Sequence, residues 1–255
     1  MTLPPLTLVI VGAPTWEAAL PALEGVRVLS CHTTQGYIDA LIMNYAALIL
    51  VDADAPDWQR WTHAPKSSPA TRRIPIVALM HALDEARTAH AHQNGVDVVL
   101  SVQAFLQDAP AIVRQHARTM DAQQRAELAC DCAEPLPQRA EQAIAKFNAG
   151  EYYAQHDLLE LEWAESTRPV RDLYRAILQV GVAYYQIERG NHRGALKMLQ
   201  RSVQWLLILP NVCQTVDVAD LRANAFAVLA ELQRVGEAGI ADFDRTLIKP
   251  IQRAP

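Results

Sequence analysis

Residues 48–57 read LILVDADAPD, an apolar run that ends in one aspartate and is followed by a second aspartate and a proline. A strand made of consecutive apolar residues is buried on both faces, which is typical of a parallel sheet covered by helices. A buried strand that ends in an aspartate looks like a phosphoryl acceptor. Whether Asp52 can act as one depends on the residues that the rest of the chain places around it.

Further β-rich runs lie on both sides of this stretch, and segments with helical spacing separate them. Alternating strands and helices predict an α/β fold with a doubly wound parallel sheet. The expected strands are residues 7–12, 26–30, 47–52, 74–80 and 96–102, and the expected helices include residues 15–25, 33–45 and 83–95.

The pattern changes at about residue 104, after which no strand pattern remains and amphipathic helices follow one another. We expect an all-α helical bundle domain after the sheet domain, with the boundaries 1–120, a helical connector at 121–136, and 137–255. The helices are expected at roughly 105–130, 137–148, 151–165, 169–188, 192–208 and 217–234.

Composition excludes several classes of protein. The formal charge is −5, and neither half has the basic surplus that binding to a nucleic acid requires. No apolar segment approaches the length of a membrane span, so we expect neither secretion nor membrane insertion. The four cysteines are scattered, and the pair Cys130 and Cys132 is too weak a pattern for a metal site. We expect reduced thiols and a cytoplasmic location.

Residues 5–120 resemble the receiver domain of bacterial response regulators, in which Asp52 and Pro56 match the acceptor aspartate and the proline four places after it. The resemblance implies the strand order 2-1-3-4-5. It also implies a set of partners for the acceptor: two acids after the first strand that hold magnesium, a hydroxyl after the fourth, and a lysine after the fifth. A divalent cation and a fixed positive charge are needed because the attacking carboxylate and the donor are both anions.

This set of partners is broken in the present sequence. Gly12 and Ala13 stand where the acidic pair is expected, Met80 stands in place of the hydroxyl residue, and Val102 and Gln103 replace the lysine and its proline. None of these side chains supplies the carboxylates, the hydroxyl or the positive charge that the set requires. The resemblance therefore implies a pseudo-receiver that is retained for its surface.

Two interpretations of the acidic loop remain. Asp54 and Asp57 are nearby acids that could bind a cation together with Asp52. Alternatively, Asp52 is a carboxylate at a strand end that hydrogen-bonds the loop after it, which is the interpretation we favour. We therefore treat Asp52 as a vestigial acceptor position and predict that it is not phosphorylated.

The helical half contains two similar turns, GEYYAQHDLLE at Gly150 and GNHRGALKMLQ at Gly190. The small residues Ala154 and Gly194 would allow close helix packing, as in tetratricopeptide-like pairs. Two weak copies do not make a solenoid, because stacked repeats need about three units to bury a continuous core.

About residues 136–210 resemble the all-helical family known as domain of unknown function 309, whose pattern combines F-N-x-G-E-Y, H-E-x-L-E-x-x-W, L-I-Q and R-G-N-x-x-G-A. Gln155 departs from the family near an expected acid. The resemblance implies a fold and a surface, and no reaction. The matching residues are Phe147, Asn148, Gly150, Glu151, Tyr152, His156, Asp157, Leu159, Glu160, Trp163, Ile177, Leu178, Gln179, Arg189, Gly190, Asn191, Gly194 and Ala195.

A candidate pocket or polar network centres on His156. Tyr152, His156 and Glu160 follow at i, i+4 spacing and share one helix face. One interpretation is a buried network in which Glu160 orients His156 and an arginine of the next helix neutralises the acid. Another is a shallow pocket for a metal or small anion, with His156 and Glu160 as weak metal candidates, and a third is an exposed helix. The remaining members of the candidate set are Trp163, Arg175 and Gln179.

Two classes of function follow. The first is a non-catalytic signalling or scaffold protein without a cofactor, whose receiver-like domain docks or forms a homodimer and whose helical domain binds a protein partner. Apolar Val98, Val99 and Ala104 near the last strand favour self-association. The second is a metal-binding, small-ligand-binding or enzymatic helical domain around His156 and Glu160. A DNA-binding regulator is disfavoured, because no basic recognition helix is present.

Overall fold

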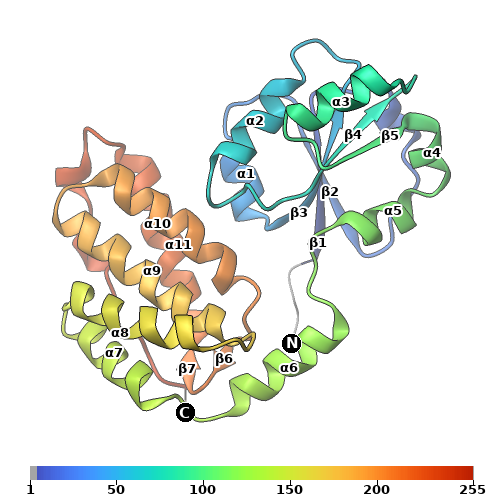
Figure 1. The fold of residues 1–255 in the computed structure, drawn as a ribbon. Helices are drawn as coiled ribbons and strands as arrows, with labels where there is room; N and C mark the ends of the chain where they lie inside the picture. The colour runs from blue at the N-terminus through green and yellow to red at the C-terminus, as the bar shows by residue number, and fades with distance from the viewer. Residues whose placement is uncertain (1–4, 255) are drawn as a thin grey trace. The chain divides into compact units, whose positions relative to one another are not determined.

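In the computed structural model, which describes residues 5–254, the chain divides into two compact units at Thr119 and Met120. The first unit combines a sheet with helices, and the second is mostly helical (Figure 1). Each unit buries its own set of apolar side chains, so each has its own hydrophobic core.

The sheet of the first unit has the predicted order β2-β1-β3-β4-β5, and all of its neighbouring strands are parallel. The apolar runs form its inner strands because side chains alternate between two buried faces. Along β1, Leu8 and Ile10 enter one core, whereas Val9 and Val11 enter the other. The strands are β1 Leu6–Val11, β2 Val26–Cys31, β3 Ala46–Asp52, β4 Ile76–Met80 and β5 Val98–Ser101.

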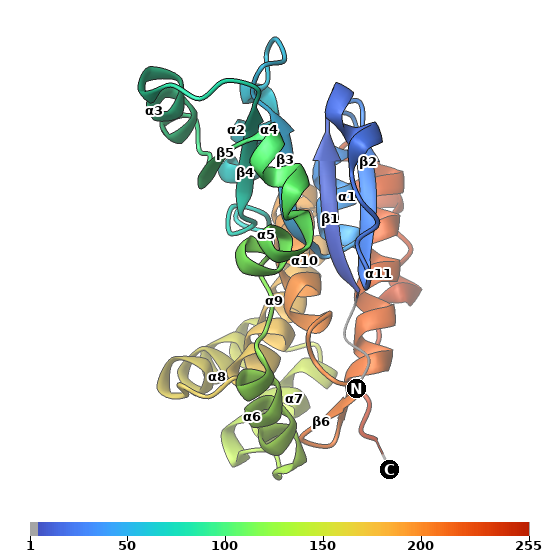
Figure 2. The same ribbon diagram turned by 90° about the vertical axis from the view of Figure 1, so that its right-hand side faces the viewer.

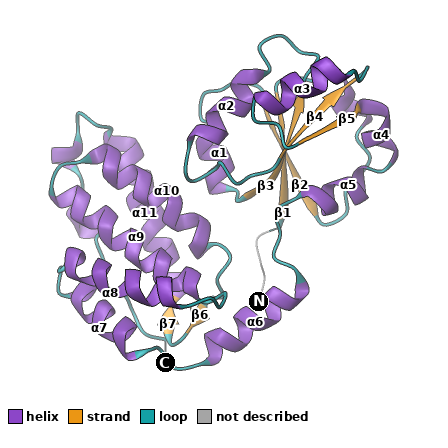
Figure 3. Ribbon diagram, viewed as in Figure 1, coloured by secondary structure: helices purple, strands orange, loops and turns teal. Residues whose placement is uncertain are grey.

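Helices cover both faces of this sheet, and Figure 3 shows them on the two sides of the fan of strands. Tyr37 and Trp61 lie in the core on one side, while Trp16 and Phe105 lie in the core on the other. Strand order 2-1-3-4-5 with helices on both faces is the receiver fold. The first side carries α1 Tyr37–Met43, α2 Gln59–Ser67 and α3 Glu85–Gln93, and the second carries η1 Thr15–Ala19, α4 Val102–Gln107 and α5 Ala109–His116.

Two predicted helices differ from the structure. The helix expected at residues 15–25 is only the short 3₁₀ segment η1, because Pro21 lacks an N–H and forces Leu20 into an extended conformation. The helix expected at 105–130 is broken into α4, α5 and α6. Ala117 is extended, and Asp121 begins α6 with a capping box, so the polar sequence between them ends one helix and starts another.

In the second unit, each helix from α7 to α11 packs against the next along the chain, and Figure 2 shows α9 beside α10. The two similar turns also match in structure. Gly150 and Gly190 both have positive φ, and each is followed by an N–H that bonds back five residues, Glu151 to Lys146 at 2.9 Å and Asn191 to Gln186 at 2.8 Å. The helices are α6 Ala122–Ala133, α7 Gln138–Asn148, α8 Tyr152–Glu165, α9 Arg171–Glu188, α10 His192–Leu206 and α11 Val218–Val235.

A short hairpin in the second unit was not predicted. Strands β6 Val212–Cys213 and β7 Val216–Asp217 pair through a turn in which Gln214 and Thr215 both have positive φ. The sequence lacks the Asn-Gly signal that usually marks such a turn. None of the helices in the described range is long and apolar enough to cross a membrane.

A disulfide between Cys132 and Cys213 joins the end of α6 to this hairpin. The expectation of four reduced thiols is therefore wrong for this pair, while Cys31 and Cys130 are free. The two bonded cysteines are separated by 81 positions, and sequence spacing alone does not reveal such a pairing.

Candidate functional sites

Asp52 ends β3 at the carboxyl edge of the sheet. Its Oδ1 atom accepts a hydrogen bond from the backbone N–H of Asp54 at 2.9 Å. The predicted hydrogen bond between Asp52 and its following loop is confirmed. Asp52 thus stabilises the turn that leaves the strand, as a carboxylate at this position commonly does.

Asp54 is the centre of a polar cluster at the same edge. Its carboxylate pairs with the guanidinium of Arg87 and accepts the backbone N–H of His81 at 2.7 Å. The same Oδ2 lies 2.9 Å from Nδ1 of the His81 ring. Burial by itself would raise the pKa of Asp54, but the hydrogen bonds from Arg87 and His81 outweigh it and lower the pKa to about 2.

Arg87 also connects two loops. Its Nη1 donates to the carbonyl of Ala82 at 3.0 Å, after β4, and its Nη2 lies 3.4 Å from the carbonyl of Ala53, after β3. The guanidinium therefore holds the ends of two neighbouring strands together through Asp54. Arg87 and His81 are not among the predicted site residues, because nothing in their local sequence patterns distinguishes them from surface residues of a helix and a loop.

Three of the positions that differ from the receiver pattern, Gly12, Met80 and Val102, carry no polar side-chain atom. Gly12 follows β1 with φ +80°, and its N–H bonds the carbonyl of Cys31 at 2.9 Å. Met80 at the end of β4 and Val102 at the start of α4 are both buried. Asp57 is exposed and also has positive φ. At this edge of the sheet, the carboxylate of Asp54 is therefore paired with groups of the protein itself.

In the second unit, His156 is partly exposed and its surroundings differ from the predicted network. Its Nδ1 lies 3.2 Å from the carboxylate of Asp157, and its ring stacks on Tyr153, which is 66% exposed. Tyr153 in turn packs on Tyr185, whose hydroxyl accepts a hydrogen bond from Arg189 at 2.8 Å. His156 thus belongs to an aromatic surface that crosses from α8 to α9.

The prediction that Glu160 orients His156 is wrong. After Tyr152, each buried position of α8 lies one residue earlier in the chain than the prediction placed it. The buried residues are Tyr152, Gln155 and Leu159, which share a face at i, i+3 and i+7 spacing. His156 is rotated by about 100° from Gln155, which turns it toward the surface. Glu160 is exposed.

The other candidate residues lie in two separate environments. Arg175 stacks between Trp163 and Trp205, with its guanidinium carbon 5.1 Å and 4.2 Å from the two ring centroids. Arg171 also lies over Trp163, at 4.8 Å. This arrangement holds α8, α9 and α10 together through cation–π contacts. Gln179 is buried, and its Oε1 has no hydrogen-bond partner within residues 5–254.

Tyr152 belongs to a buried aromatic cluster with Phe147 and Tyr184. The three ring centroids lie 5.3 to 5.6 Å apart. Burial raises the pKa of both Tyr152 and Tyr184, so neither hydroxyl is prepared for proton transfer near neutral pH. The cluster fixes the first hairpin of the unit against α9.

Two further residues of the helical unit have structural roles. Asn148 makes two hydrogen bonds to the backbone of Ile251, one at 2.7 Å and one at 3.1 Å, and so holds the C-terminal segment. Arg168 pairs with Asp131 and Glu134 near the disulfide, which raises the pKa of Arg168. Over the described part of the chain, no group of three or more His, Cys, Asp or Glu side chains is placed to hold a metal ion.

One family model matches part of the second unit. Residues 140–198 match the family described as Domain of unknown function (DUF309). A search of the curated proteins found no match.

Solved receiver structures resemble the first unit. The signal receiver domain of a DNA-binding response regulator from Colwellia psychrerythraea 34H is 16% identical, with a TM-score of 0.34 over 43% of this chain and 96% of that chain. The response regulator domain of Thermotoga maritima CheB is 11% identical, with a TM-score of 0.35 over 44% of this chain and 95% of that chain. A response regulator in red light signaling of R. palustris is 14% identical, with a TM-score of 0.35 over 45% of this chain and 100% of that chain.

Proposed function

We propose that this chain is a non-catalytic signalling or scaffold protein. Its receiver-like unit docks or dimerises without phosphorylation, and its helical unit binds a protein partner. The observation that carries the proposal is the ion pair between Asp54 and Arg87, which lies at the edge of the sheet where a receiver would assemble its cation and phosphoryl site.

The chemistry of acyl phosphate formation supports this proposal. Transfer to a carboxylate needs a divalent cation and a positive charge that are both free to meet the phosphoryl group. Here Arg87 is a nearby cation, but its hydrogen bonds go to Asp54 and to the carbonyls of Ala53 and Ala82. Met80 and Val102 supply no polar atom. Asp52 therefore lacks the partners that would stabilise a phosphorylated state.

A phosphodonor experiment tests the proposal. The full chain is incubated with magnesium and acetyl phosphate, and its intact mass is measured alongside Asp52→Asn and the exposed control Asp57→Asn. We expect no mass increase in any of the three. An acid-labile phosphoryl group on the native chain that disappears only in Asp52→Asn would refute the proposal.

The alternative function, a metal or small-ligand site at His156 and Glu160, has less support. His156 is partly exposed and bonds Asp157, while Glu160 is exposed. An isolated imidazole and carboxylate supply too few ligands for zinc, which usually takes three or four from the protein. Metal analysis of the purified chain separates the two functions, because stoichiometric zinc lost in His156→Ala would favour the alternative.

A further inference from the structure

Residues 248–254 form a strap on the second unit that has no helix and only one isolated β-bridge. Within it, Ile251 is only 3% exposed, whereas Gln252 and Arg253 on either side of the bridge are exposed. A segment without secondary structure of its own needs other parts of the chain to pair its buried backbone groups. The strap is therefore held in the way that a separate peptide would be.

The side chain of Asn148, at the end of α7, binds the strap through its backbone. Its Oδ1 accepts the N–H of Ile251 at 2.7 Å, and its Nδ2 donates to the carbonyl of the same residue at 3.1 Å. One amide side chain thus pairs with both backbone polar groups of one residue, as a neighbouring strand would. Because these bonds reach the main chain, they do not depend on the side chain that stands at this position.

The edge of β7 binds the next part of the strap. The N–H of Asp217 donates to the carbonyl of Gln252 at 3.0 Å, and the N–H of Ala254 donates to the carbonyl of Thr215 at 2.8 Å. The antiparallel bridge at Arg253 lies between these two bonds. The strap is therefore added beside the β6–β7 hairpin, which is the arrangement of peptide recognition by strand addition.

Two side chains of the strap make contacts that select a sequence. Ile251 is buried, and Nη2 of Arg253 lies 3.0 Å from Oε1 of Glu141 on α7. Side chains alternate along an extended segment, so positions 251 and 253 share one side and Gln252 faces the other. The surface therefore suits an apolar residue that is followed two positions later by a basic one.

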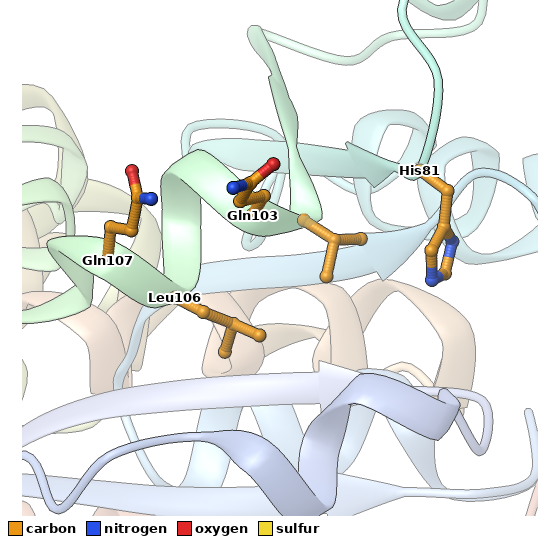
Figure 4. Close-up of a pocket in the computed structure, with 5 residues that line it drawn as sticks. His81, Gln103, Leu106 and Gln107 are labelled. Carbon is orange, nitrogen blue, oxygen red and sulfur yellow. The ribbon is translucent and has the colours of Figure 1, made fainter.

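These groups converge on one segment, which distinguishes the strap surface from the open hollow on the first unit. His81 and residues of α4 line that hollow, and Figure 4 shows the amides of Gln103 and Gln107 on the opposite side of α4 from Leu106. The polar and apolar groups of the hollow therefore do not meet a single ligand. At the strap, backbone bonds, a buried apolar side chain and an ion pair all act on residues 251–254.

We propose that the surface formed by Asn148, Glu141 and the edge of β7 is a peptide-binding site, which the strap closes in the free chain. Its partner is a protein that presents an extended segment with an apolar residue and, two positions later, arginine or lysine. The proposal rests on the proposed function, because it states what the partner of the helical unit must present. The ion pair of the strap is exposed and therefore weak, so the strap should open at a lower cost than the helical bundle unfolds.

The test measures binding of the fluorescein-labelled peptide TLIKPIQRA, the sequence of residues 246–254, to the full chain by fluorescence anisotropy. In the native chain the tethered strap competes at an effective concentration of about 1 mM, so we expect weak binding. In Ile251→Asp, a carboxylate cannot occupy the buried position and the strap opens. The peptide should then bind at least about tenfold more tightly.

Further substitutions in the Ile251→Asp chain identify the contacts. Asn148→Leu removes both backbone bonds and should weaken peptide binding by about thirtyfold, the value of two hydrogen bonds. Glu141→Lys reverses the charge opposite Arg253, so it should favour a peptide in which that arginine is replaced by glutamate. Glu24→Lys makes the same change at an exposed position of the first unit and is the matched control.

The ratio of the affinities for the two peptides is measured on one protein, so it stays informative if a variant is less stable. The proposal is overturned if Ile251→Asp binds the peptide no more tightly than the native chain, or if Glu141→Lys and Glu24→Lys give the same ratio. It is also overturned if the peptide splits a native dimer into monomers, because a second copy would then be the occupant. None of these outcomes concerns phosphorylation of Asp52, so a failure of the peptide site is distinguishable from a failure of the proposed function.

Discussion

The side-chain amide of Gln155 on α8 occupies the space next to Gly181 on α9 that a Cβ atom at position 181 would need. Gln155 is fully buried, and its Nε2 donates to the carbonyl of Leu178 at 3.3 Å. Phe147 lies on the same side, 3.3 Å from the Cβ position. The close approach of the two helices therefore depends on the missing side chain of Gly181.

Gly181→Ala should lower the unfolding temperature, although alanine is the better helix former by about 1 kcal/mol. The added methyl group must displace a buried amide, and overpacking of this kind costs about 1–3 kcal/mol. In a Gln155→Ala background the space is empty, so the same substitution should raise the unfolding temperature. Circular dichroism melts of the native chain, the two single variants and the double variant measure the coupling free energy between positions 155 and 181. An effect of equal sign in both backgrounds would show that the two residues do not share this space.

His156→Ala should change stability little, by less than about 0.5 kcal/mol, because the imidazole is partly exposed and bonds an exposed acid. Leu159→Ala, one turn away on the buried face of α8, should cost about 2–5 kcal/mol. Urea unfolding of the native chain and of the two variants measures the change in the free energy of unfolding for each substitution. A large loss in His156→Ala would restore the buried network that the sequence suggested.

The sheet and the helical turns could be predicted because their signals are local. Apolar runs such as residues 47–52 determine buried parallel strands, and the turns at Gly150 and Gly190 end helices through positive φ. The prediction of a helix at 15–25 is wrong because Pro21 ends the helical conformation at Leu20, although the composition of the segment is otherwise helical.

Tertiary contacts determine which residues come together in the candidate sites, and a local sequence pattern does not reveal them. On α8, Gln155 and His156 differ by one position, and only packing against Gly181 shows which of the two faces inward. Gly181 itself was a usable signal, since a glycine inside a long helix usually has a packing reason. The pairing of Asp54 with Arg87 spans 33 positions and has no sequence signature.

Asp54 should titrate near pH 2, whereas an exposed aspartate titrates near pH 4. Its folded pKa is below the unfolded value, so the stabilisation that it provides is present above about pH 4 and is lost as the pH falls toward 2. Removal of the guanidinium in Arg87→Gln should raise the midpoint by about one to two units. The chemical shift of the Asp54 carboxyl carbon, followed by nuclear magnetic resonance as the pH is lowered, gives the pKa of Asp54 in the native chain and in Arg87→Gln. A native midpoint near 4 would mean that the ion pair does not form in solution.

Self-association remains a prediction of the proposed function. β5 is an edge strand of the sheet, Val98 and Val99 are only partly buried on it, and Ala104 is exposed close by on α4. Light scattering should show a dimer at micromolar concentration. Ala104→Arg would bring two like charges together across a symmetric contact and should shift the protein toward monomer. A native chain that scatters as a monomer at all concentrations would exclude this role for the edge.

The Cys132–Cys213 disulfide should leave only Cys31 and Cys130 free, so the denatured, unreduced chain should react with two equivalents of a thiol reagent and the reduced chain with four. A bond that closes a loop of 81 positions lowers the entropy of the unfolded chain, and this stabilises the folded state by about 4 kcal/mol. Reduction, or Cys213→Ser, should therefore lower the unfolding temperature of the helical unit. Cys130→Ser changes an exposed thiol outside the bond and is the matched control. Four reactive thiols without reductant would show that the pair is reduced, and the end of α6 would then be held by Arg168 with Asp131 and Glu134.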